Sequence, residues 1–292
     1  MSFVKEFSAI VKQDEPLAPY TYMKIGGPAR YFAEPRTADE LRTLLTRARN
    51  EGLPVYILGG GSNILVRDEG VNGLVLRTSA PAFRSITVQG ERVVAGAGAS
   101  LWSTIRAAAE HRLAGLEVLA GIPGTVGGAL RMNAGGRFGD IGQFTHRVTV
   151  MDWDGQVREL ARDELSFQYR DSGIDEPIIL EGVFVLEEDD PAAIARRMKK
   201  VWITKKASQP LSFQSAGCIF KNVRGLSAGV LIEQAGLKGY RVGSAEVSER
   251  HANFIVAHPG CTARDVLRLI DLIRERVRAK FGVELELEIK IW

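Results

Sequence analysis

Glycine is the residue that most constrains how this chain can fold. The 292 residues include 31 glycines, and the densest runs of them lie at 59–61 and 121–128, without a regular period. Because glycine lacks a Cβ atom, such runs let a second backbone or a ligand approach closely. Aperiodic runs of this kind do not occur in collagen-like fibres or coiled coils, so we expect loops that contact a ligand within a folded protein.

The overall composition is that of a folded globular protein. Hydrophobic residues make up 45% and charged residues 25% of the chain, the net charge is +3 and the pI is about 8.9. This mildly basic balance suits an anionic small molecule and gives little support for nucleic-acid binding. The N-terminus lacks a signal-peptide pattern, and no apolar run approaches the ~20 residues of a membrane span. Cys218 and Cys261 lie outside any CxxC pair, so we expect a reduced, cytoplasmic protein, with a monomer as the default.

Helix and strand signals mix along the first 80 residues. A capping box at Thr37 and Glu40 predicts a helix that ends near Gly52, and the apolar run 54–58 predicts a short buried strand. Two more strands are expected around a turn at 68–70, one at 64–66 and one at 74–76. This mixture predicts an α+β unit.

Two further parts follow, one from 81 to about 205 and one from Gln209 onward. The first predicts a hairpin at 85–95, a helix at 100–113, strands at 147–153, 156–160 and 177–186, and a helix from Pro191 to about 200. The second predicts a short helix at 226–235, a helix from the capping box of Thr262 and Asp265 to Gly282, and a strand at 283–292. The last strand is expected because its apolar residues alternate strictly.

The common nucleotide-binding and catalytic motifs are absent. The sequence contains no P-loop, no complete GxGxxG fingerprint, no GxSxG elbow and no metal-ligand spacing among its four histidines. The loop at 59–63, which follows a predicted strand, could still hold an anion through backbone N–H groups and through Ser62 and Asn63. A tight turn is the alternative. The second glycine run favours a long ligand such as a flavin dinucleotide, which needs two surfaces of close approach.

Single residues remain ambiguous from their local context. Arg170 could hold a carboxylate with two hydrogen bonds, although its local sequence alone favours a solvated arginine on a loop. Cys218 has the apolar neighbours of an inert core thiol. Glu288 lies on the polar face of the last predicted strand, where most glutamates are solvated. The basic run 196–206 predicts the wet face of a helix and could also meet a diphosphate.

Ten segments, taken together and in order, resemble one family. They are YTYMKIGGP (20–28), LGGGSN (58–63), GAG (96–98), LAGIPGTVGGA (119–129), MNAG (132–135), FQYR (167–170), SAGCIFKN (215–222), AGVLI (228–232), GLKG (236–239) and HANF (251–254). With these segments the chain resembles the UDP-N-acetylenolpyruvoylglucosamine reductases, the flavoenzymes of bacterial peptidoglycan precursor synthesis. It resembles the shorter type of the family. Val223 and Leu287 stand where the family often has proline.

The resemblance implies a fold. It is an α+β fold with an FAD-binding part of the vanillyl-alcohol-oxidase type in two subdomains, residues 1–80 and 81–205, and a smaller substrate-binding domain, 206–282. The strand at 283–292 would return to the first subdomain. FAD would be non-covalent, because neither glycine run carries the histidine or cysteine to which covalent relatives attach it.

The resemblance also implies an activity and roles for residues. NADPH would be the co-substrate, and UDP-N-acetylglucosamine enolpyruvate would receive a hydride from flavin N5 and a proton from Cys218. Arg170 would bind the substrate carboxylate and Glu288 would orient it, while Tyr169, Lys221 and Asn222 would bind other parts of the substrate. FAD would be held, largely by backbone N–H groups, at Gly59, Gly60, Gly61, Ser62, Asn63, Ile122, Pro123, Gly124, Thr125, Gly127, Gly128 and Ala129.

Two other functions stay open at this point. One is an oxidase of the same flavin fold that acts on an alcohol or an amine, which oxygen rather than the enolpyruvyl compound would reoxidise. The other is a nucleotide-binding module without catalysis, which would be colourless and unable to bind FAD. No metal, nucleic acid or membrane partner is expected.

Overall fold

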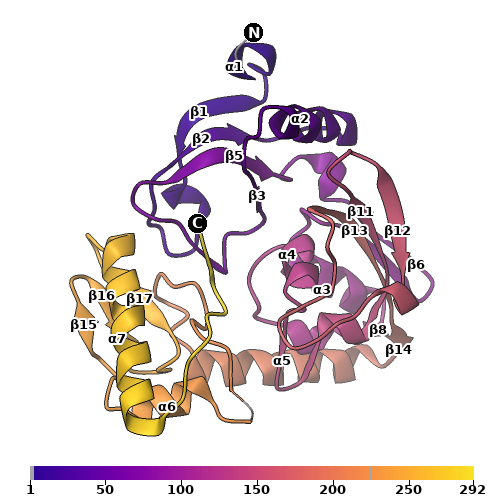
Figure 1. Cartoon of the computed structure of the whole chain (residues 1–292). Helices are drawn as coiled ribbons and strands as arrows, with labels where there is room; N and C mark the ends of the chain where they lie inside the picture. The colour runs from indigo at the N-terminus through magenta and orange to yellow at the C-terminus, as the bar shows by residue number, and fades with distance from the viewer. Residues whose placement is uncertain (1–2, 224) are drawn as a thin grey trace. The chain divides into compact units, whose positions relative to one another are not determined.

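The computed structural model describes residues 3–223 and 225–292, which divide into two compact units. Unit 1 comprises residues 3–13, 31–60 and 72–204, and unit 2 comprises residues 14–30, 61–71 and 205–292. Neither unit is one continuous stretch of sequence, because the chain passes from one to the other several times. Figure 1 traces this path by colour from the N-terminus to the C-terminus.

Local capping signals fix where three of the helices begin. Thr37, Ser100 and Thr262 each accept, through the side-chain oxygen, a hydrogen bond from the backbone N–H three residues later. The helices are α1 (Phe3–Glu6), α2 (Ala38–Asn50), α3 (Leu101–Glu110), α4 (Val126–Arg131), α5 (Pro191–Ser208), α6 (Ala228–Gln234) and α7 (Ala263–Phe281). The capping box of Thr262 and Asp265 is confirmed. At Thr37 only half of the expected box forms, because the Glu40 carboxylate accepts from the N–H of Arg36 instead.

A five-stranded antiparallel sheet forms most of the later part of unit 1. Its order is β12 (Val157–Ala161), β11 (Thr145–Met151), β13 (Ile178–Val185), β7 (Arg92–Gly96) and β6 (Ile86–Gln89). Helices α3 and α4 pack against this sheet, and their apolar residues form one core with it (Figure 1). The predicted hairpin and the three predicted strands of this region are confirmed.

A four-stranded sheet contains the earlier strands, and most of its residues belong to unit 1. Its order is β1 (Val11–Pro16), β2 (Pro28–Ala33), β5 (Val71–Arg77) and β3 (Val55–Leu58), with β3 and β5 parallel. The apolar face of α2, which includes Leu41 and Leu44, packs with Leu74 and Leu76 of β5 in a second core. The sequence did not predict β1 or β2.

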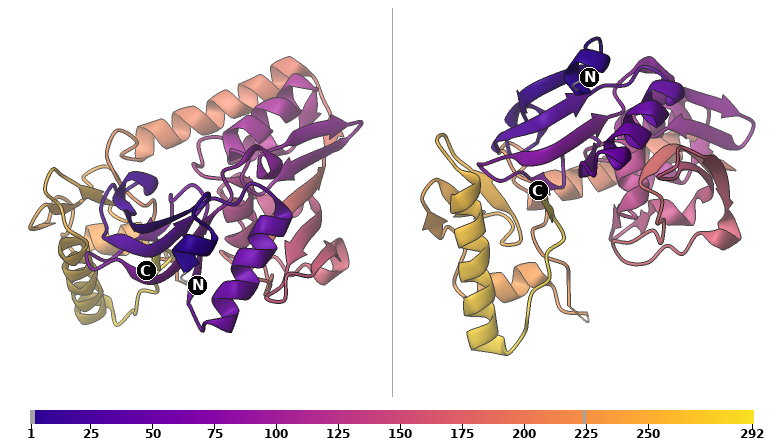
Figure 2. Two further views of the ribbon diagram at one scale, coloured as in Figure 1. Left: turned by 90° about the horizontal axis from the view of Figure 1, so that it is seen from above. Right: turned by 45° about the horizontal axis from the view of Figure 1, so that its top comes forward.

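Unit 2 is built around α7. This helix lies against a three-stranded antiparallel sheet of β15 (Arg241–Val242), β16 (Ala245–Val247) and β17 (Ile255–Ala257), which Figure 1 labels. Figure 2 shows the same helix, in yellow, from two further directions. Val266, Ile270 and Ile273 of the helix are buried in a core that also includes Met23 and Leu65 from the N-terminal segments of the unit. Short α6 contributes Leu231 and Ile232 to the same core.

The remaining strands of the described residues form three pairs of two residues each. They are β4 (Ile64–Leu65) with β18 (Lys290–Ile291), β8 (Leu113–Ala114) with β14 (Glu187–Glu188), and β9 (Gly135–Gly136) with β10 (Gly139–Asp140).

Three predicted boundaries were wrong. The last strand is regular only at Lys290–Ile291, because the residues before it bond to the segment after Cys218 and not to one continuous partner. The alternation that suggested a strand is real, since Leu285 and Ile289 are buried. Helix α5 runs to Ser208 rather than ending near 200, and α3 ends at Glu110, where the chain continues into a left-handed residue, Arg112.

Asp68 completes the start of α7 from a distant turn. Its carboxylate accepts the N–H groups of Ala263 at 2.8 Å and Arg264 at 3.0 Å, which are the first two donors of the helix. We expect Asp68→Ala to lower the free energy of unfolding by about 1–2 kcal/mol. The two N–H groups lose their acceptor, and the positive end of the helix dipole loses a nearby negative charge. Denaturant unfolding measures this. Ala at the exposed neighbour Glu69 is the matched control, and an equal loss in both variants would contradict the role of Asp68.

No helix among residues 3–223 and 225–292 is long and apolar enough to cross a membrane.

Candidate functional site

The two glycine runs meet within unit 1. Gly59 and Gly60 follow β3, and a Cβ atom added to Gly59 would lie 2.6 Å from Oγ1 of Thr125. One added to Gly60 would lie 2.7 Å from Cα of Gly124. Because distances below about 3 Å do not occur for real Cβ atoms, only glycine permits this approach. The structure thus joins the two runs, which lie more than sixty residues apart in the sequence.

The second run, at 121–128, also packs against a third glycine-containing segment, GAG at 96–98. A Cβ atom on Gly127 would lie 2.8 Å from Cβ of Ala97, and the Gly127 N–H donates to the Ala97 carbonyl at 2.8 Å. The N–H groups of Ile122 and Ala129 likewise donate to carbonyls of Leu119 and Thr125. Gly128 donates to Oγ1 of Thr125, the N-cap of α4. These four N–H groups are therefore already used inside the protein. Among their residues, Gly127 is the one whose missing side chain lets the second run lie against Ala97.

Tyr169 and Arg170 form the tip of a tight turn in unit 1. Gln168 and Asp171 bond to each other through both backbone N–H groups, at 2.8 and 3.1 Å, and close the turn. Arg170 has a φ of +60°, and Nη1 of its guanidinium donates to the carbonyl of Gly135 at 3.0 Å. The guanidinium carbon lies 5.2 Å from the centre of the Tyr169 ring, a cation–π distance. The arginine is thereby held in a defined place rather than extended into solvent.

The C-terminal end of α4 holds this turn. Asn133 is buried, and its Nδ2 donates to the carbonyl of Gln168 at 2.9 Å while its Oδ1 accepts the N–H of Gly142 at 3.0 Å. Arg131 donates to the carbonyls of Ile174 and Glu176 after the turn. Burial lowers the pKa of the Arg131 guanidinium, and its side chain is satisfied by those carbonyls. From the sequence, Asn133 stood out only as part of the segment MNAG, and no role was predicted for Arg131.

The remaining glycine-loop residues, Gly61, Ser62 and Asn63, belong to unit 2. A Cβ atom on Gly61 would lie 2.1 Å from the carbonyl oxygen of Tyr20, and the N–H of Tyr22 donates to the Gly61 carbonyl at 3.0 Å. Asn63 reaches the other way. Its Nδ2 donates to the carbonyl of Glu288 at 3.1 Å. The loop therefore connects the segment at 20–28 with the C-terminal segment that carries Glu288.

Cys218 and Glu288 lie on adjoining extended segments of unit 2. The N–H of Glu288 donates at 2.8 Å to the carbonyl of Ile219, the residue after Cys218. On its other side the Cys218 segment forms an isolated bridge with Phe254. Both Cys218 and Glu288 are half-buried. The structure thus brings together two candidate residues that are seventy positions apart.

Lys221 and Asn222 continue the same segment. Nζ of Lys221 lies 3.6 Å from Oε2 of Glu286, an exposed pair of small energetic weight. Oδ1 of Asn222 accepts the N–H of Ala228, the first residue of α6, at 3.0 Å. Asn222 therefore has a structural task whatever ligand it meets.

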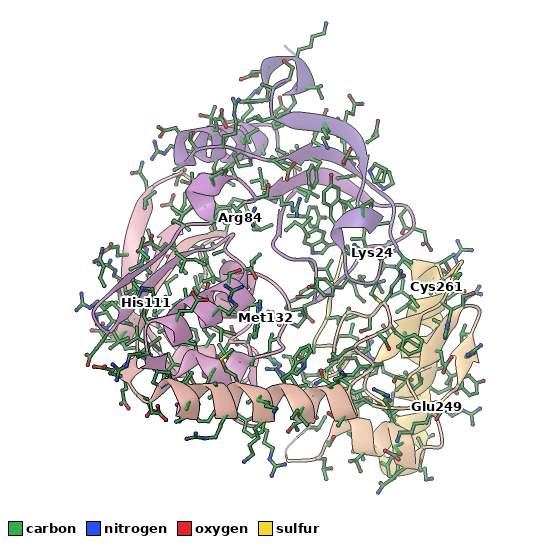
Figure 3. All side chains as sticks on the ribbon, turned by 180° about the vertical axis from the view of Figure 1, so that it is seen from behind. Lys24, Arg84, His111, Met132, Glu249 and Cys261 are labelled. Atoms are coloured by element: carbon green, nitrogen blue, oxygen red, sulfur yellow. The ribbon has the colours of Figure 1, made fainter. Side chains whose placement is uncertain are left out.

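The two cysteines have different environments. Cys261 is buried just before α7 begins (Figure 3), and burial raises the pKa of its thiol to about 11, with Asp265 and Asp68 adding to the effect. Such a thiol is inert near neutral pH.

Among the described residues, no group of three or more His, Cys, Asp or Glu side chains is arranged as a metal site.

The candidate residues are thus divided between the units. Unit 1 holds Gly59, Gly60, the run 122–129, Tyr169 and Arg170, whereas unit 2 holds Gly61, Ser62, Asn63, Cys218, Lys221, Asn222 and Glu288. A buried asparagine of unit 2, Asn253, was missed, although it lies in a quoted motif; it bonds to the segment after Cys218.

Family models match both parts of the chain. Residues 29–161 match the FAD binding domain model, and residues 209–292 match the model of the UDP-N-acetylenolpyruvoylglucosamine reductase C-terminal domain. A UDP-N-acetylenolpyruvoylglucosamine reductase 2 of Symbiobacterium thermophilum is 48% identical over 97% of this chain and 92% of its own length. The reductase of Moorella thermoacetica is 44% identical over 97% of this chain and 93% of its own length.

Solved structures agree with these matches. The crystal structure of UDP-N-acetylenolpyruvylglucosamine reductase from Thermus caldophilus superposes with a TM-score of 0.83, at 40% identity, over 97% of this chain and 98% of that chain. A glucose oxidase variant of Phl p 4 superposes with a TM-score of 0.50 at 15% identity, over 64% of this chain and 43% of that chain, which shows the fold alone. The predicted α+β fold, with an FAD-binding part of the vanillyl-alcohol-oxidase type, is confirmed. The chain belongs to the UDP-N-acetylenolpyruvoylglucosamine reductase family.

Proposed function

We propose that this chain reduces UDP-N-acetylglucosamine enolpyruvate to UDP-N-acetylmuramate, with FAD as its cofactor and NADPH as the electron donor. The double bond of the enolpyruvyl group gains a hydride at its terminal carbon and a proton at the adjoining carbon, while NADPH becomes NADP⁺. The observation that carries the proposal is the similarity, over 97% of the chain, to relatives that bear the reductase name.

The glycine runs fit a bound dinucleotide. Gly59 and Gly60 lie so close to Gly124 and Thr125 that no side chain fits between them, so the two runs proposed to hold FAD lie against each other. The residues that would hold FAD are those at 59–63 and 122–129. FAD, when bound, supplies the hydride chemistry that amino-acid side chains lack. Several N–H groups of the second run already donate to carbonyls of this protein. The proposed binding of FAD at this run therefore rests on the close approach that glycine permits to its backbone, and not on hydrogen bonds from these N–H groups.

Arg170 is the proposed site of the substrate carboxylate. Negative charge develops next to that carboxylate as the double bond is reduced, and a fixed guanidinium stabilises it. The turn at 168–171, the Gly135 carbonyl and the Tyr169 ring hold Arg170 before any ligand arrives, so little reorganisation is needed.

Cys218 is the proposed proton donor, and Glu288 orients the carboxylate end of the substrate. The Glu288 N–H donates to the carbonyl of Ile219, the residue after Cys218, so the two residues lie on neighbouring bonded segments, which supports a shared task in unit 2. Lys221 and Asn222 follow on the same segment and would bind the UDP part, and Tyr169 of unit 1 another part of the substrate. We keep the division of tasks expected from the sequence: FAD binding by 1–80 with 283–292 and by 81–205, and substrate binding by 206–282.

The visible spectrum of the purified protein tests the proposal. Without oxygen, NADPH should bleach the yellow flavin band, and the enolpyruvyl substrate should restore it. Acid precipitation should release all flavin into the supernatant, because we expect the FAD to be non-covalent. A reduced band that only oxygen restores would point to an oxidase of the same fold. A colourless protein that takes up no FAD would point to a module without catalysis, and either outcome rejects the proposal.

Gly60 offers a direct test of the cofactor site. Gly60→Ala forces a methyl group against the Gly124 backbone, and an overpacking cost of ~1–3 kcal/mol that falls on the FAD-binding form would lower the affinity for FAD about 5- to 150-fold. Titration of the apoprotein with FAD, followed by flavin fluorescence, measures the affinity. Gly136→Ala is the matched control, because a Cβ atom there meets nothing within 4 Å. Equal affinities in the two variants would remove these glycines from the FAD site.

A further inference from the structure

Asn253 is a buried residue that bonds to the segment immediately after Cys218. It is 3% exposed. Its Oδ1 accepts the N–H of Phe220 at 2.9 Å, and its Nδ2 donates to the carbonyl of the same residue at 2.8 Å. Its own backbone carbonyl accepts the N–H of Ile219 at 2.8 Å. One asparagine thus makes three hydrogen bonds to the two residues that follow Cys218.

The direction of two backbone N–H groups explains why residue 253 needs a hydrogen-bonding side chain. In a regular strand successive N–H groups point to opposite sides. Here the N–H groups of Ile219 and Phe220 both point toward residue 253, so one backbone carbonyl cannot satisfy them both. The Asn253 amide supplies the second acceptor and, with its NH₂ group, also satisfies the Phe220 carbonyl.

The opposite side of the same segment faces Glu288. The Ile219 carbonyl accepts the Glu288 N–H, and the Lys221 N–H donates to the Glu286 carbonyl, both at 2.8 Å. Residues 219–221 therefore form the middle layer between residue 253 and residues 286–288. A shift of this layer moves the Cys218 thiol and the Glu288 backbone together.

We infer that Asn253 is a positioning residue for proton transfer: its paired hydrogen bonds to Phe220 fix the backbone that places Cys218 beside the Glu288 segment. The inference rests on the proposed function, since it concerns the half-reaction in which the substrate is protonated. Asparagine alone fits the task among residues of this size. Aspartate lacks the donor for the Phe220 carbonyl, and leucine, of similar shape, lacks both bonding groups.

The first test compares half-reactions in the FAD-loaded enzyme. In Asn253→Leu and Asn253→Asp, NADPH should reduce the flavin within about twofold of the native rate, whereas reoxidation by substrate should slow at least about twentyfold, as expected when a proton donor is misplaced. In a Cys218→Ala background, Asn253→Asp should add little further loss, because a residue that acts through the thiol has no effect once the thiol is gone. Full additivity of the two losses would overturn the inference.

The second test needs no substrate. We expect the rate at which iodoacetamide alkylates Cys218, followed by peptide mass spectrometry, to change at least about threefold in the Asn253 variants, because thiol reactivity depends on access and local field. Cys261 should stay unmodified and so report that the fold is intact. Glu246→Gln is the stability control in the same unit, since it disturbs a buried carboxylate that bonds to Arg241 and His258. It should leave the Cys218 rate unchanged.

The outcomes separate two failures. If the native enzyme is not reoxidised by the substrate, the proposed function fails, and the alkylation rates alone decide whether Asn253 positions Cys218. If the native enzyme works and either folded Asn253 variant reoxidises at the native rate, the inference is overturned. If both variants fail to fold, Asn253→Ser, which keeps one bonding group, should show an intermediate reoxidation rate, and a native rate there would equally overturn it.

Discussion

The Cys218→Ala enzyme should lose its yellow colour under NADPH as fast as the native enzyme, yet recover it far more slowly when the enolpyruvyl substrate is added. We expect the second rate to fall about 10²–10⁴-fold, the usual contribution of a positioned general acid. Stopped-flow absorbance without oxygen measures both rates. A thiol that only packs in the core would instead cost stability and leave both rates intact, so reoxidation at the native rate would exclude Cys218 as the donor.

Serine at the same position is the control, and it adds a pH signature. Cys218→Ser should retain considerable activity, because a hydroxyl can donate a proton from the same place. A cysteine thiol has a reference pKa of about 8.5 and can donate only while protonated. Native reoxidation should therefore be fastest below the thiol pKa and fall as the pH rises through it, and the serine enzyme should lack this decline. The same decline in both proteins would assign it to another group.

The Arg170→Lys enzyme should be impaired in the same half-reaction. Lysine keeps the positive charge but loses the planar pair of donors that grips a carboxylate. It also loses the fixed contacts to Gly135 and the Tyr169 ring. We expect a loss of about 2–4 kcal/mol of transition-state stabilisation, as for one oxyanion donor, with flavin reduction much less affected.

The matched control for Arg170 is Arg137→Lys. Arg137 is an exposed arginine of the same unit, between β9 and β10, and its replacement should change neither rate. Single-turnover rates of the two half-reactions decide the outcome. Equal slowing of reduction and reoxidation in Arg170→Lys would mean that the arginine supports the fold or the flavin rather than the substrate.

The elements that could be predicted from the sequence are those whose signals are local. Thr37, Ser100 and Thr262 each cap a helix with a side chain that lies three residues from its partner, so the capping pattern identifies the start. Strand β1 (Val11–Pro16) has no such signal. Its residues Lys-Gln-Asp-Glu are mostly exposed, and only its neighbour in the sheet makes it a strand.

The site could be predicted as a set of residues but not as an arrangement. The motifs pointed to Arg170, Cys218 and Glu288, whose roles here remain proposals. Asn133 and Asn253, which bond to the segments that carry Arg170 and Cys218, do so through backbone groups far from them in the sequence. Such bonds leave no mark in the local sequence, because the backbone groups they satisfy belong to every residue type.

One departure from the family pattern has a structural account. The N–H of Val223 donates to the carbonyl of Leu226 at 3.0 Å, and the Leu226 N–H returns a bond at 2.8 Å. Proline, which is common at this position in the family, could not make the first bond because it has no N–H. This chain therefore joins Val223 and Leu226 by a pair of backbone hydrogen bonds, one of which a proline at 223 could not make.

The way in which unit 2 is assembled limits how this protein can evolve. The fragment 209–292 matches a family model of its own, but its core also contains Met23 and Leu65, strand β18 pairs with β4, and α7 begins on Asp68. A gene exchange that replaced this fragment would leave the incoming segment without its matched partners at all three places. New substrate preferences in such a chain are therefore expected to arise by point substitution rather than by recombination of ready-made modules.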